Sequence, residues 1–334
     1  GHNHEAVFMD IEQGLSANAI SLIAGTIKGA GLFVLSLRHF DTWLTQQDCE
    51  QARYLPWPLT HQDAKPYFKR YFLDKLALSN VKHIKLVKGQ LAEKPLAKLA
   101  QHTNALTATQ EQTDLINQVQ RFARTSVQAH KVKASQLIIA HRGRGKSTAL
   151  GMALAQLTNS ALAIRFAITG PNKAALSQLE TSYRRTLKDQ ESALEPLFLS
   201  PDSLIHSPKH LDFLIVDEAA ALPLPMLKTL FDLYHQLIFS STNHGYEGAG
   251  KGFGIKFTDY LKQEGQKMER LTLNEPVRWA KGDKLEAFID ALLLLDNHPR
   301  VNRETRCSDK LEIQEIKHGA WAQQSNLLSD CFSL

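Results

Sequence analysis

The sequence predicts a three-layer α/β fold built on a parallel sheet, and three observations favour it. Short apolar runs alternate along the chain with segments of helical periodicity, the order that parallel βαβ units produce. The clearest runs, at residues 136–140 (QLIIA), 213–216 (FLIV) and 237–241 (LIFSS), are mostly apolar, as expected for a sheet covered on both faces. The chain also has 334 residues, more than one core usually holds, so we expect two domains.

The composition is that of a soluble globular protein. A formal net charge of +5 permits an anionic partner such as nucleic acid without requiring one. Cys49, Cys307 and Cys331 lie far apart and show no metal-ligand spacing, so we expect a reducing compartment, a cytoplasmic location and no structural zinc. The longest apolar stretches are well short of the roughly 20 residues that a membrane span needs, and no secretory signal is visible, so we expect no membrane partner.

The first third of the chain predicts a smaller α/β domain. Residues 6–11 (AVFMDI) and 32–37 (LFVLSL) read as strands separated by a helix over residues 18–28. Residues 67–78 have helical spacing of aromatic and leucine residues. The basic residues of this helix are expected on its solvated face, with a nucleic-acid contact as the alternative; they are Lys69, Arg70 and Lys75.

A polar, lysine-rich connector over residues 81–104 predicts the boundary between the domains. We therefore expect an N-terminal domain over residues 1–100 and a second domain over residues 101–334. Thr107 is expected to cap a helix whose buried stripe includes Leu115 and Val119.

The strand at residues 136–140 runs into the segment A-H-R-G-R-G-K-S-T, and a helix is expected over residues 147–157. This context, strand then glycine-rich loop then helix, is that of a phosphate-binding P-loop, although alanine stands where the pattern usually begins with glycine. Gly143 and Gly145 permit the tight turn that directs backbone N–H groups at phosphates. Lys146 is expected to reach the β- and γ-phosphates of ATP, and Ser147 to bind Mg²⁺.

An acidic pair follows the strand at residues 213–216. Asp217 and Glu218 are adjacent carboxylates at a strand end, where burial is costly unless a cation compensates. We expect Asp217 to hold the Mg²⁺ and Glu218 to orient or deprotonate the attacking water. Further strands are expected at residues 162–168 and 271–273.

Three further positions complete the predicted site. Thr242, at the end of the strand at residues 237–241, is the candidate sensor of the γ-phosphate. Gln110 has the amide donor and acceptor needed to pair with the adenine edge, although an exposed helical glutamine is the alternative. Arg278 is the candidate arginine finger. Residues 248–252 (GAGKG) lack a hydroxyl after the lysine and are expected to form a loop facing nucleic acid or a partner, or a plain linker.

These motifs, in this order, resemble the helicase-like module of the bacterial tRNA(Met) cytidine acetyltransferases. The segments that carry the resemblance are LTATQ, RGRGKS, FLIVDEAAALP, STNHGYEGAGKGF and EPVRWA. The resemblance implies an N-terminal α/β domain followed by a RecD-like ATPase module. It further implies nucleotide contacts from the base-binding Gln110, from the loop that includes Arg144 and Thr148, and from Arg278, with Glu218 in the acidic motif.

The family resemblance also implies a function and partners. Its members use ATP and acetyl-CoA to make N4-acetylcytidine at the wobble position of elongator methionine tRNA. No acetyl-CoA-binding loop of the Q/R-x-x-G-x-G/A pattern follows Arg278, so we expect this chain to be a fragment or truncated relative that does not itself transfer acetyl groups. We expect an ATPase, using ATP and Mg²⁺, that remodels tRNA. Two alternatives stay open: a regulatory protein that binds ATP with little turnover, and a RecD-type DNA helicase.

Overall fold

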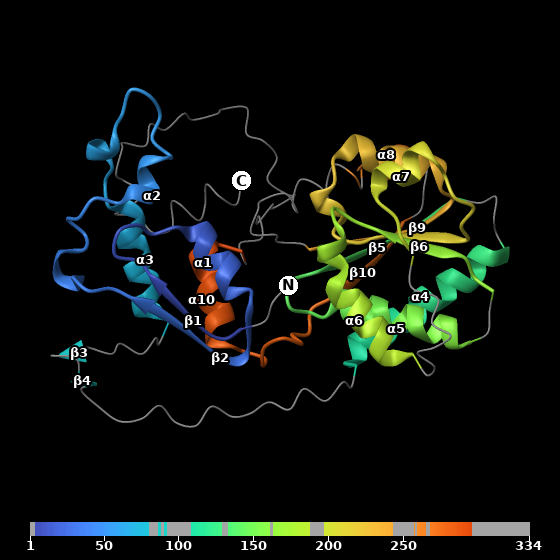
Figure 1. The fold of residues 1–334 in the computed structure, drawn as a ribbon, viewed down its shortest axis with the longest axis horizontal. Coiled ribbons are helices and arrows are strands. Elements are labelled where there is room, and N and C mark those ends of the chain that lie inside the picture. The colour runs from blue at the N-terminus through green and yellow to red at the C-terminus, as the bar shows by residue number, and fades with distance from the viewer. Residues whose placement is uncertain are drawn as a thin grey trace, which may run out of the picture. The chain divides into compact units, whose positions relative to one another are not determined.

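The chain forms two compact units, which are described one at a time (Figure 1). The computed structural model describes residues 4–79, 86–87, 90–91, 108–128, 133–160, 163–187, 197–242, 257, 259–264 and 268–295. The large unit comprises Gly1–Asn3 and His102–Lys281, and the small unit comprises His4–Gln101 and Gly282–Leu334. In the part of the chain that these ranges cover, no helix combines the length and apolar character needed to cross a membrane.

The large unit is a six-stranded sheet in which every neighbouring pair is parallel, in the order β10-β5-β9-β8-β6-β7. Its strands are β5 (Ala134–Ala140), β6 (Phe166–Thr169), β7 (Leu197–Phe198), β8 (Phe213–Val216), β9 (Gln236–Thr242) and β10 (Met268–Leu273). Its helices are α4 (Gln110–Gln128), α5 (Lys146–Asn159), α6 (Ser177–Thr186), α7 (Pro201–His206) and α8 (Leu224–Leu233), with 3₁₀ turns at Lys173–Leu176 and Ala219–Ala221.

Helices cover both faces of this sheet, with α4, α5 and α6 on one side and α7 and α8 on the other (Figure 1). The alternation of side chains along each strand explains why two cores form. In β5, Ile138 belongs to the core beneath α4, α5 and α6, whereas Leu137 and Ile139 belong to the core beneath α7 and α8. The three-layer α/β fold with a parallel sheet, predicted from the apolar runs, is therefore confirmed.

The small unit contains a two-stranded parallel sheet, β1 (His4–Asp10) and β2 (Ile27–Ser36), joined by helix α1 (Ala17–Ala24). It also contains α2 (Cys49–Ala52), α3 (Tyr67–Leu78), the short antiparallel pair β3 (Leu86–Val87) and β4 (Gln90–Leu91), and 3₁₀ turns at Phe40–Thr42 and His61–Asp63. The predicted strand–helix–strand order is confirmed. The first helix is shorter than predicted, because it ends before Gly25 and the chain enters β2 at Ile27.

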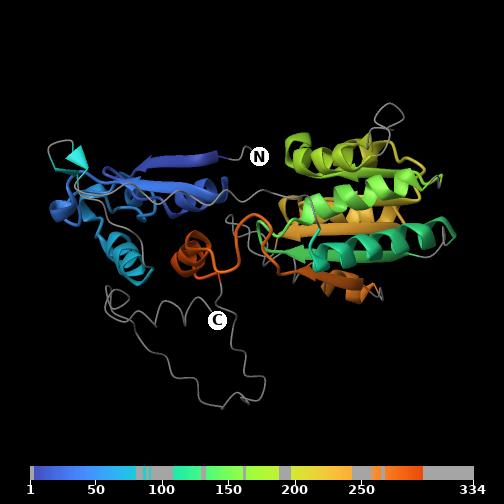
Figure 2. The same cartoon turned by 90° about the horizontal axis from the view of Figure 1, so that it is seen from below.

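Helix α10 (Lys284–Leu293) packs in the small unit, beside α1 and α3 (Figure 2). The Phe288 ring lies 5.9 Å from the Phe72 ring, edge to face, and the Tyr71 hydroxyl donates to the carbonyl oxygens of Ala291 and Leu292 at 3.1 Å. The chain thus returns to the small unit after β10. The expected single boundary near residue 100 does not describe this return, because helical periodicity gives no information about which unit a helix packs against.

Lys69 is completely buried, and the prediction that it lies on the solvated face of its helix was wrong. Its ammonium group donates to the carbonyl oxygens of Trp43 and Gln46, both at 3.1 Å, and lies 5.0 Å from the Trp43 ring centre. Burial lowers the pKa of Lys69, partly offset by nearby Asp48. The lysine thus fixes the segment before α2, while Arg70 of the same helix is exposed as predicted.

We expect Phe72→Ala to destabilise the small unit by about 3–5 kcal/mol, because Phe72 is fully buried between the Trp43 and Phe288 rings. Urea unfolding followed by circular dichroism measures this loss. Leu78→Ala, in the same helix but 80% exposed, is the matched control and should change the free energy of unfolding by less than about 0.5 kcal/mol. Equal effects of the two substitutions would contradict the packing of α10 on α3.

Candidate functional site

The glycine-rich loop leaves β5 at Ala140 and enters α5 at Lys146, as predicted. Gly143 and Gly145 have φ values of +82° and +75°, in the left-handed region that residues with a Cβ atom rarely adopt. Space is also restricted, because a Cβ at Gly143 would lie 3.3 Å from that of Arg278 and one at Gly145 would collide with the Gln112 side chain. Glycine is therefore required at both positions, and the turn presents the N-terminus of α5, where backbone N–H groups favour anions.

Lys146 and Asp217 form a buried ion pair at the centre of the site. The Lys146 Nζ atom lies 2.8 Å from Asp217 Oδ1 and 3.0 Å from Glu218 Oε1. Lys146 is 6% exposed and Asp217 is 0% exposed. The predicted loop and the predicted acidic pair, 71 residues apart in sequence, therefore meet in space.

Asp217 accepts hydrogen bonds on both of its carboxylate oxygens. The Ser147 hydroxyl donates to Oδ2 at 3.0 Å, and the Ser240 hydroxyl and the Glu218 N–H donate to Oδ1 at 2.6 and 3.0 Å. Burial alone would raise the pKa of Asp217, but the Lys146 ammonium and the Ser240 and Ser147 hydroxyls hold the pKa of that carboxyl below its ordinary value. Burial alone would lower the pKa of Lys146, but Asp217 and Glu218 outweigh burial and raise it. Both groups are therefore charged over a wide pH range.

Glu218 lies at the surface end of the same cluster, with 35% of its side chain exposed. Its backbone has φ +50° and ψ +44°, a left-handed conformation that costs on the order of 1–3 kcal/mol in a residue other than glycine. The Thr242 hydroxyl donates to its carboxylate, 3.1 Å from Oε2 and 3.4 Å from Oε1. The structure thus brings Thr242, predicted as the γ-phosphate sensor, against the residue predicted to act on water.

Arg278 lies beside the phosphate loop, because the chain after β10 is bonded to that loop. The backbone N–H groups of Val277 and Arg278 both donate to the Gly143 carbonyl oxygen, at 2.9 and 3.0 Å. Strand β10 pairs with β5 along its whole length, which brings the end of β10 to the same edge of the sheet as the loop. The placement of Arg278 near the predicted site therefore follows from the sheet order.

The remaining predicted residues have separate contacts. Thr148 accepts a hydrogen bond from Gln178 at 3.2 Å, and Arg144 is half-buried in the loop. Gln110 is exposed, and its side chain donates to Asp114 at 3.0 Å. The glutamine that contacts the phosphate loop is Gln112, whose Nε2 donates to the Gly145 carbonyl oxygen at 3.1 Å.

Sequence reasoning missed Ser240 and Gln112. Ser240 could have been found, because it stands two positions before Thr242 in a strand and so lies on the same face of the sheet. The helix that carries Gln112 was expected to start at Thr107, which lies outside the described residues; in the structure Thr109 caps it and α4 begins at Gln110. Residues 248–252, for which two interpretations were open, also lie outside the described residues.

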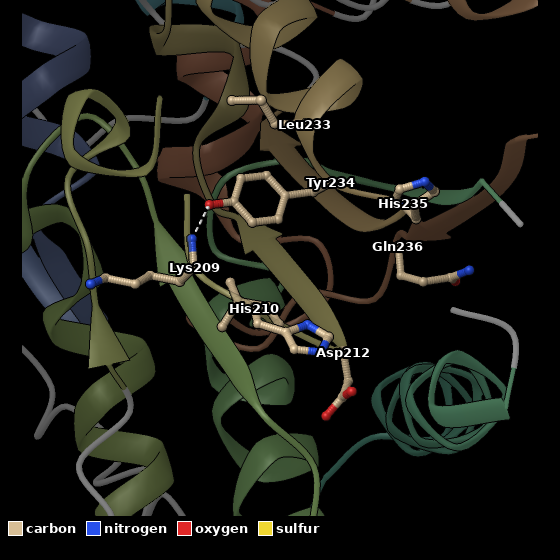
Figure 3. A pocket seen from close by; sticks show the side chains of 8 residues that line it. Lys209, His210, Asp212, Leu233, Tyr234, His235 and Gln236 are labelled. Atoms are coloured by element: carbon tan, nitrogen blue, oxygen red, sulfur yellow. Dashed lines mark hydrogen bonds between the residues drawn. The ribbon is translucent and has the colours of Figure 1, made fainter. Parts of the chain in front are cut away.

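A separate cavity of about 240 Å³ lies at the amino ends of the central strands β8 and β9 (Figure 3). Its lining includes His210, Asp212 and Tyr234, and the Lys209 N–H donates to the Tyr234 hydroxyl at 3.3 Å. The phosphate loop follows the carboxyl end of β5. Because the strands are parallel, the cavity at their amino ends lies at the far end of the strands from the loop and is not part of the site.

Comparison with known proteins identifies two matching family models. One, described as RNA cytidine acetyltransferase NAT10/TcmA, helicase domain, matches residues 137–296; the other, described as tRNA(Met) cytidine acetyltransferase TmcA, N-terminal, matches residues 1–85. Curated relatives named tRNA(Met) cytidine acetyltransferase TmcA from Vibrio cholerae and Idiomarina loihiensis are 31% and 30% identical over 100% of this chain. The chain spans 44% and 46% of their lengths, which is under half.

Among solved structures, the large terminase of a thermophilic bacteriophage is similar with a TM-score of 0.37 and 15% identity, over 50% of this chain and 46% of the terminase.

We expect Lys146→Met to destabilise the large unit by about 3–5 kcal/mol in the absence of nucleotide, because Asp217 would be left as a buried carboxylate without its cation. Adding Asp217→Asn should recover about half of this loss, since the charge that needs compensation is removed. The measurement is the urea midpoint followed by circular dichroism.

Lys262→Met is the control for this comparison, because Lys262 forms an exposed pair with Asp259 at 3.8 Å and should contribute less than about 1 kcal/mol. A Lys146→Met variant as stable as this control would show that the buried pair is not under the electrostatic constraint described above.

Proposed function

Because the chain belongs to the tRNA(Met) cytidine acetyltransferase family, of which it carries the N-terminal and helicase-domain regions, we propose that its large unit binds ATP with Mg²⁺ and hydrolyses it. The proposal rests on one observation: Lys146 and Ser147 both hydrogen-bond to Asp217 at the carboxyl ends of the parallel strands. A lysine and a hydroxyl at a helix N-terminus, opposite a carboxylate from another strand, are the groups that P-loop proteins use for a nucleotide triphosphate and its metal.

The phosphate loop is proposed to bind the β- and γ-phosphates. The two left-handed glycines, Gly143 and Gly145, let the backbone turn so that N–H groups and the N-terminus of α5 face the same point. Lys146 adds a positive charge that would move from the carboxylates to the phosphates. Arg144 and Thr148 are proposed to flank the phosphates, and Gln110 is proposed to contact the adenine edge.

The donor set of Ser147 and Asp217 suits Mg²⁺, which prefers oxygen ligands and keeps several waters. The Ser147 hydroxyl and Asp217 Oδ2 are already 3.0 Å apart, so both oxygens converge on one region. These two residues would hold the ion, which when bound neutralises charge on the β- and γ-phosphates.

Glu218 is proposed to orient or deprotonate the attacking water, and Thr242 to report the γ-phosphate. Glu218 is suited to this role because it is partly exposed, whereas Asp217 is completely buried. Arg278 is proposed to stabilise charge on the transferred phosphoryl group, a contribution that reaches about 10³–10⁵ in rate in enzymes with an arginine finger.

The family extends the proposal to RNA. The relatives are named tRNA(Met) cytidine acetyltransferases, which supports tRNA as the polymer on which hydrolysis acts. We propose that ATP hydrolysis remodels the anticodon region of elongator methionine tRNA so that its wobble cytidine becomes accessible. Modification of a base requires that it leave its stack, and unstacking costs a few kcal/mol.

We expect ATP hydrolysis by the chain to be stimulated by methionine tRNA and abolished by Lys146→Ala, measured as phosphate release. Lys262→Ala, on the exposed surface, should hydrolyse ATP at the wild-type rate. ATP binding with no turnover, with or without RNA, would support the alternative of a regulatory nucleotide-binding protein. Stronger stimulation by single-stranded DNA than by tRNA would support the DNA-helicase alternative.

We expect Glu218→Gln to lower the turnover number by about 10²–10⁴ while ATP affinity changes little, because general-base catalysis contributes in that range. The amide retains an acceptor for the Thr242 hydroxyl, so local structure should persist. Single-turnover hydrolysis and equilibrium binding of ATP separate the two quantities. Normal turnover in this variant would remove Glu218 from the proposed chemistry.

A further inference from the structure

The first turn of helix α4 is bonded to two loops that are far from it in sequence. Gln112 donates to the Gly145 carbonyl oxygen in the phosphate loop at 3.1 Å. Its neighbour Glu111 accepts hydrogen bonds on Oε2 from the backbone N–H groups of Asn274 and Glu275, at 2.6 and 2.8 Å. These two side chains, Glu111 and Gln112, are called the α4 clamp.

A capping box fixes the orientation of Gln112. Its backbone N–H donates to the Thr109 hydroxyl at 3.2 Å, and its side-chain oxygen accepts from the Thr109 N–H at 3.1 Å. Because the oxygen of the amide is used by the cap, the nitrogen must face the other way, toward Gly145. Gln112 is 3% exposed, so this hydrogen bond is shielded from water.

Glu111 acts on the segment that carries Arg278. This segment leaves β10 after Leu273 and is held at two points: at its start, where Glu111 accepts from Asn274 and Glu275, and at its end, where Arg278 donates to Gly143. The N–H groups at 274 and 275 follow the last residue of β10, beyond its pairing with β5, and the Glu111 carboxylate satisfies both of them. Hydrogen bonds to a charged acceptor are stronger than those between neutral groups.

The α4 helix, the phosphate loop and the Arg278 segment therefore form a closed set of contacts. Helix α4 holds both loops, and the loops hold each other through the Gly143 carbonyl oxygen. A closed set is stiffer than a chain of contacts, because moving one loop stretches bonds at two places. The clamp side chains bond to backbone atoms of the two loops, so they act on the site through those loops.

We propose that Glu111 is a positioning residue of the ATPase site: through the backbone of residues 274 and 275 it sets Arg278 for turnover. The inference rests on the proposed ATPase function. It assigns to Glu111 an effect on turnover and not on nucleotide affinity, because an arginine finger acts mainly on the transition state.

The decisive variants are Glu111→Ala and Glu111→Gln. We expect Glu111→Ala to lower the turnover number by about 10- to 100-fold, since small displacements of a catalytic group have effects of this size, while the ATP dissociation constant changes by less than about threefold. Glu111→Gln should restore turnover to within about threefold of wild type, because its amide oxygen can accept the same two N–H bonds. Glu180→Ala, in the first turn of α6, controls for the loss of a helix-terminal carboxylate and should leave turnover unchanged.

Hydrogen exchange at the Asn274 and Glu275 amides tests the clamp without relying on hydrolysis. Glu111→Ala should accelerate exchange at these two positions by about tenfold or more, and Glu111→Gln should not. Unchanged protection, or wild-type turnover in Glu111→Ala, would overturn the clamp. If the unaltered chain hydrolyses no ATP, the proposed function fails, and the exchange measurement alone then decides whether the clamp exists.

Discussion

The ion pair between Lys146 and Asp217 is the constraint on which the arrangement of the large unit depends. An unaccompanied carboxylate at the end of β8, surrounded by the apolar cores on both faces of the sheet, would be strongly destabilising. The lysine of the phosphate loop therefore stabilises the fold by lying within hydrogen-bonding distance of Asp217. The same ion pair thus brings together the groups that we propose to bind the nucleotide.

The order of the strands explains how the pair is formed. Strand β9 lies between β5, which leads into the phosphate loop, and β8, which ends at Asp217. The side chains that β9 contributes at this edge are small and polar: Ser240 donates to Asp217, and Thr242 donates to Glu218. A large apolar residue at either position would deprive a carboxylate of a hydrogen bond. The central strand is thus part of the site as well as of the core.

The sequence was informative where local rules decide the structure. Apolar runs predicted β5, β8 and β9 to within two residues, and the glycines predicted the loop, because φ values near +80° are a local requirement. It failed where partners are distant. Lys69 is basic and sits on a helix, but its burial depends on the carbonyl groups of Trp43 and Gln46, which no local pattern reveals.

Dependence on distant hydrogen-bond partners also explains why the sequence did not identify the glutamine of α4 that contacts the phosphate loop. Thr109, Gln110 and Gln112 are all polar, and only the capping box determines which glutamine turns toward Gly145. Gln110 remains a prediction for the base contact.

The two carboxylates of the site differ in what they would lose when Lys146 turns to a phosphate. Asp217 would still accept from Ser240 and the Glu218 N–H, and the Mg²⁺ proposed to bind Ser147 and Asp217 would supply the compensating positive charge. Glu218 would keep the Thr242 hydroxyl and would face solvent with the rest of its carboxylate. Under the proposed function, Asp217 would stay in place in the framework and Glu218 would be available as the base. The proposed division of roles rests on the different hydrogen bonds and exposure of two adjacent acidic residues at one strand end.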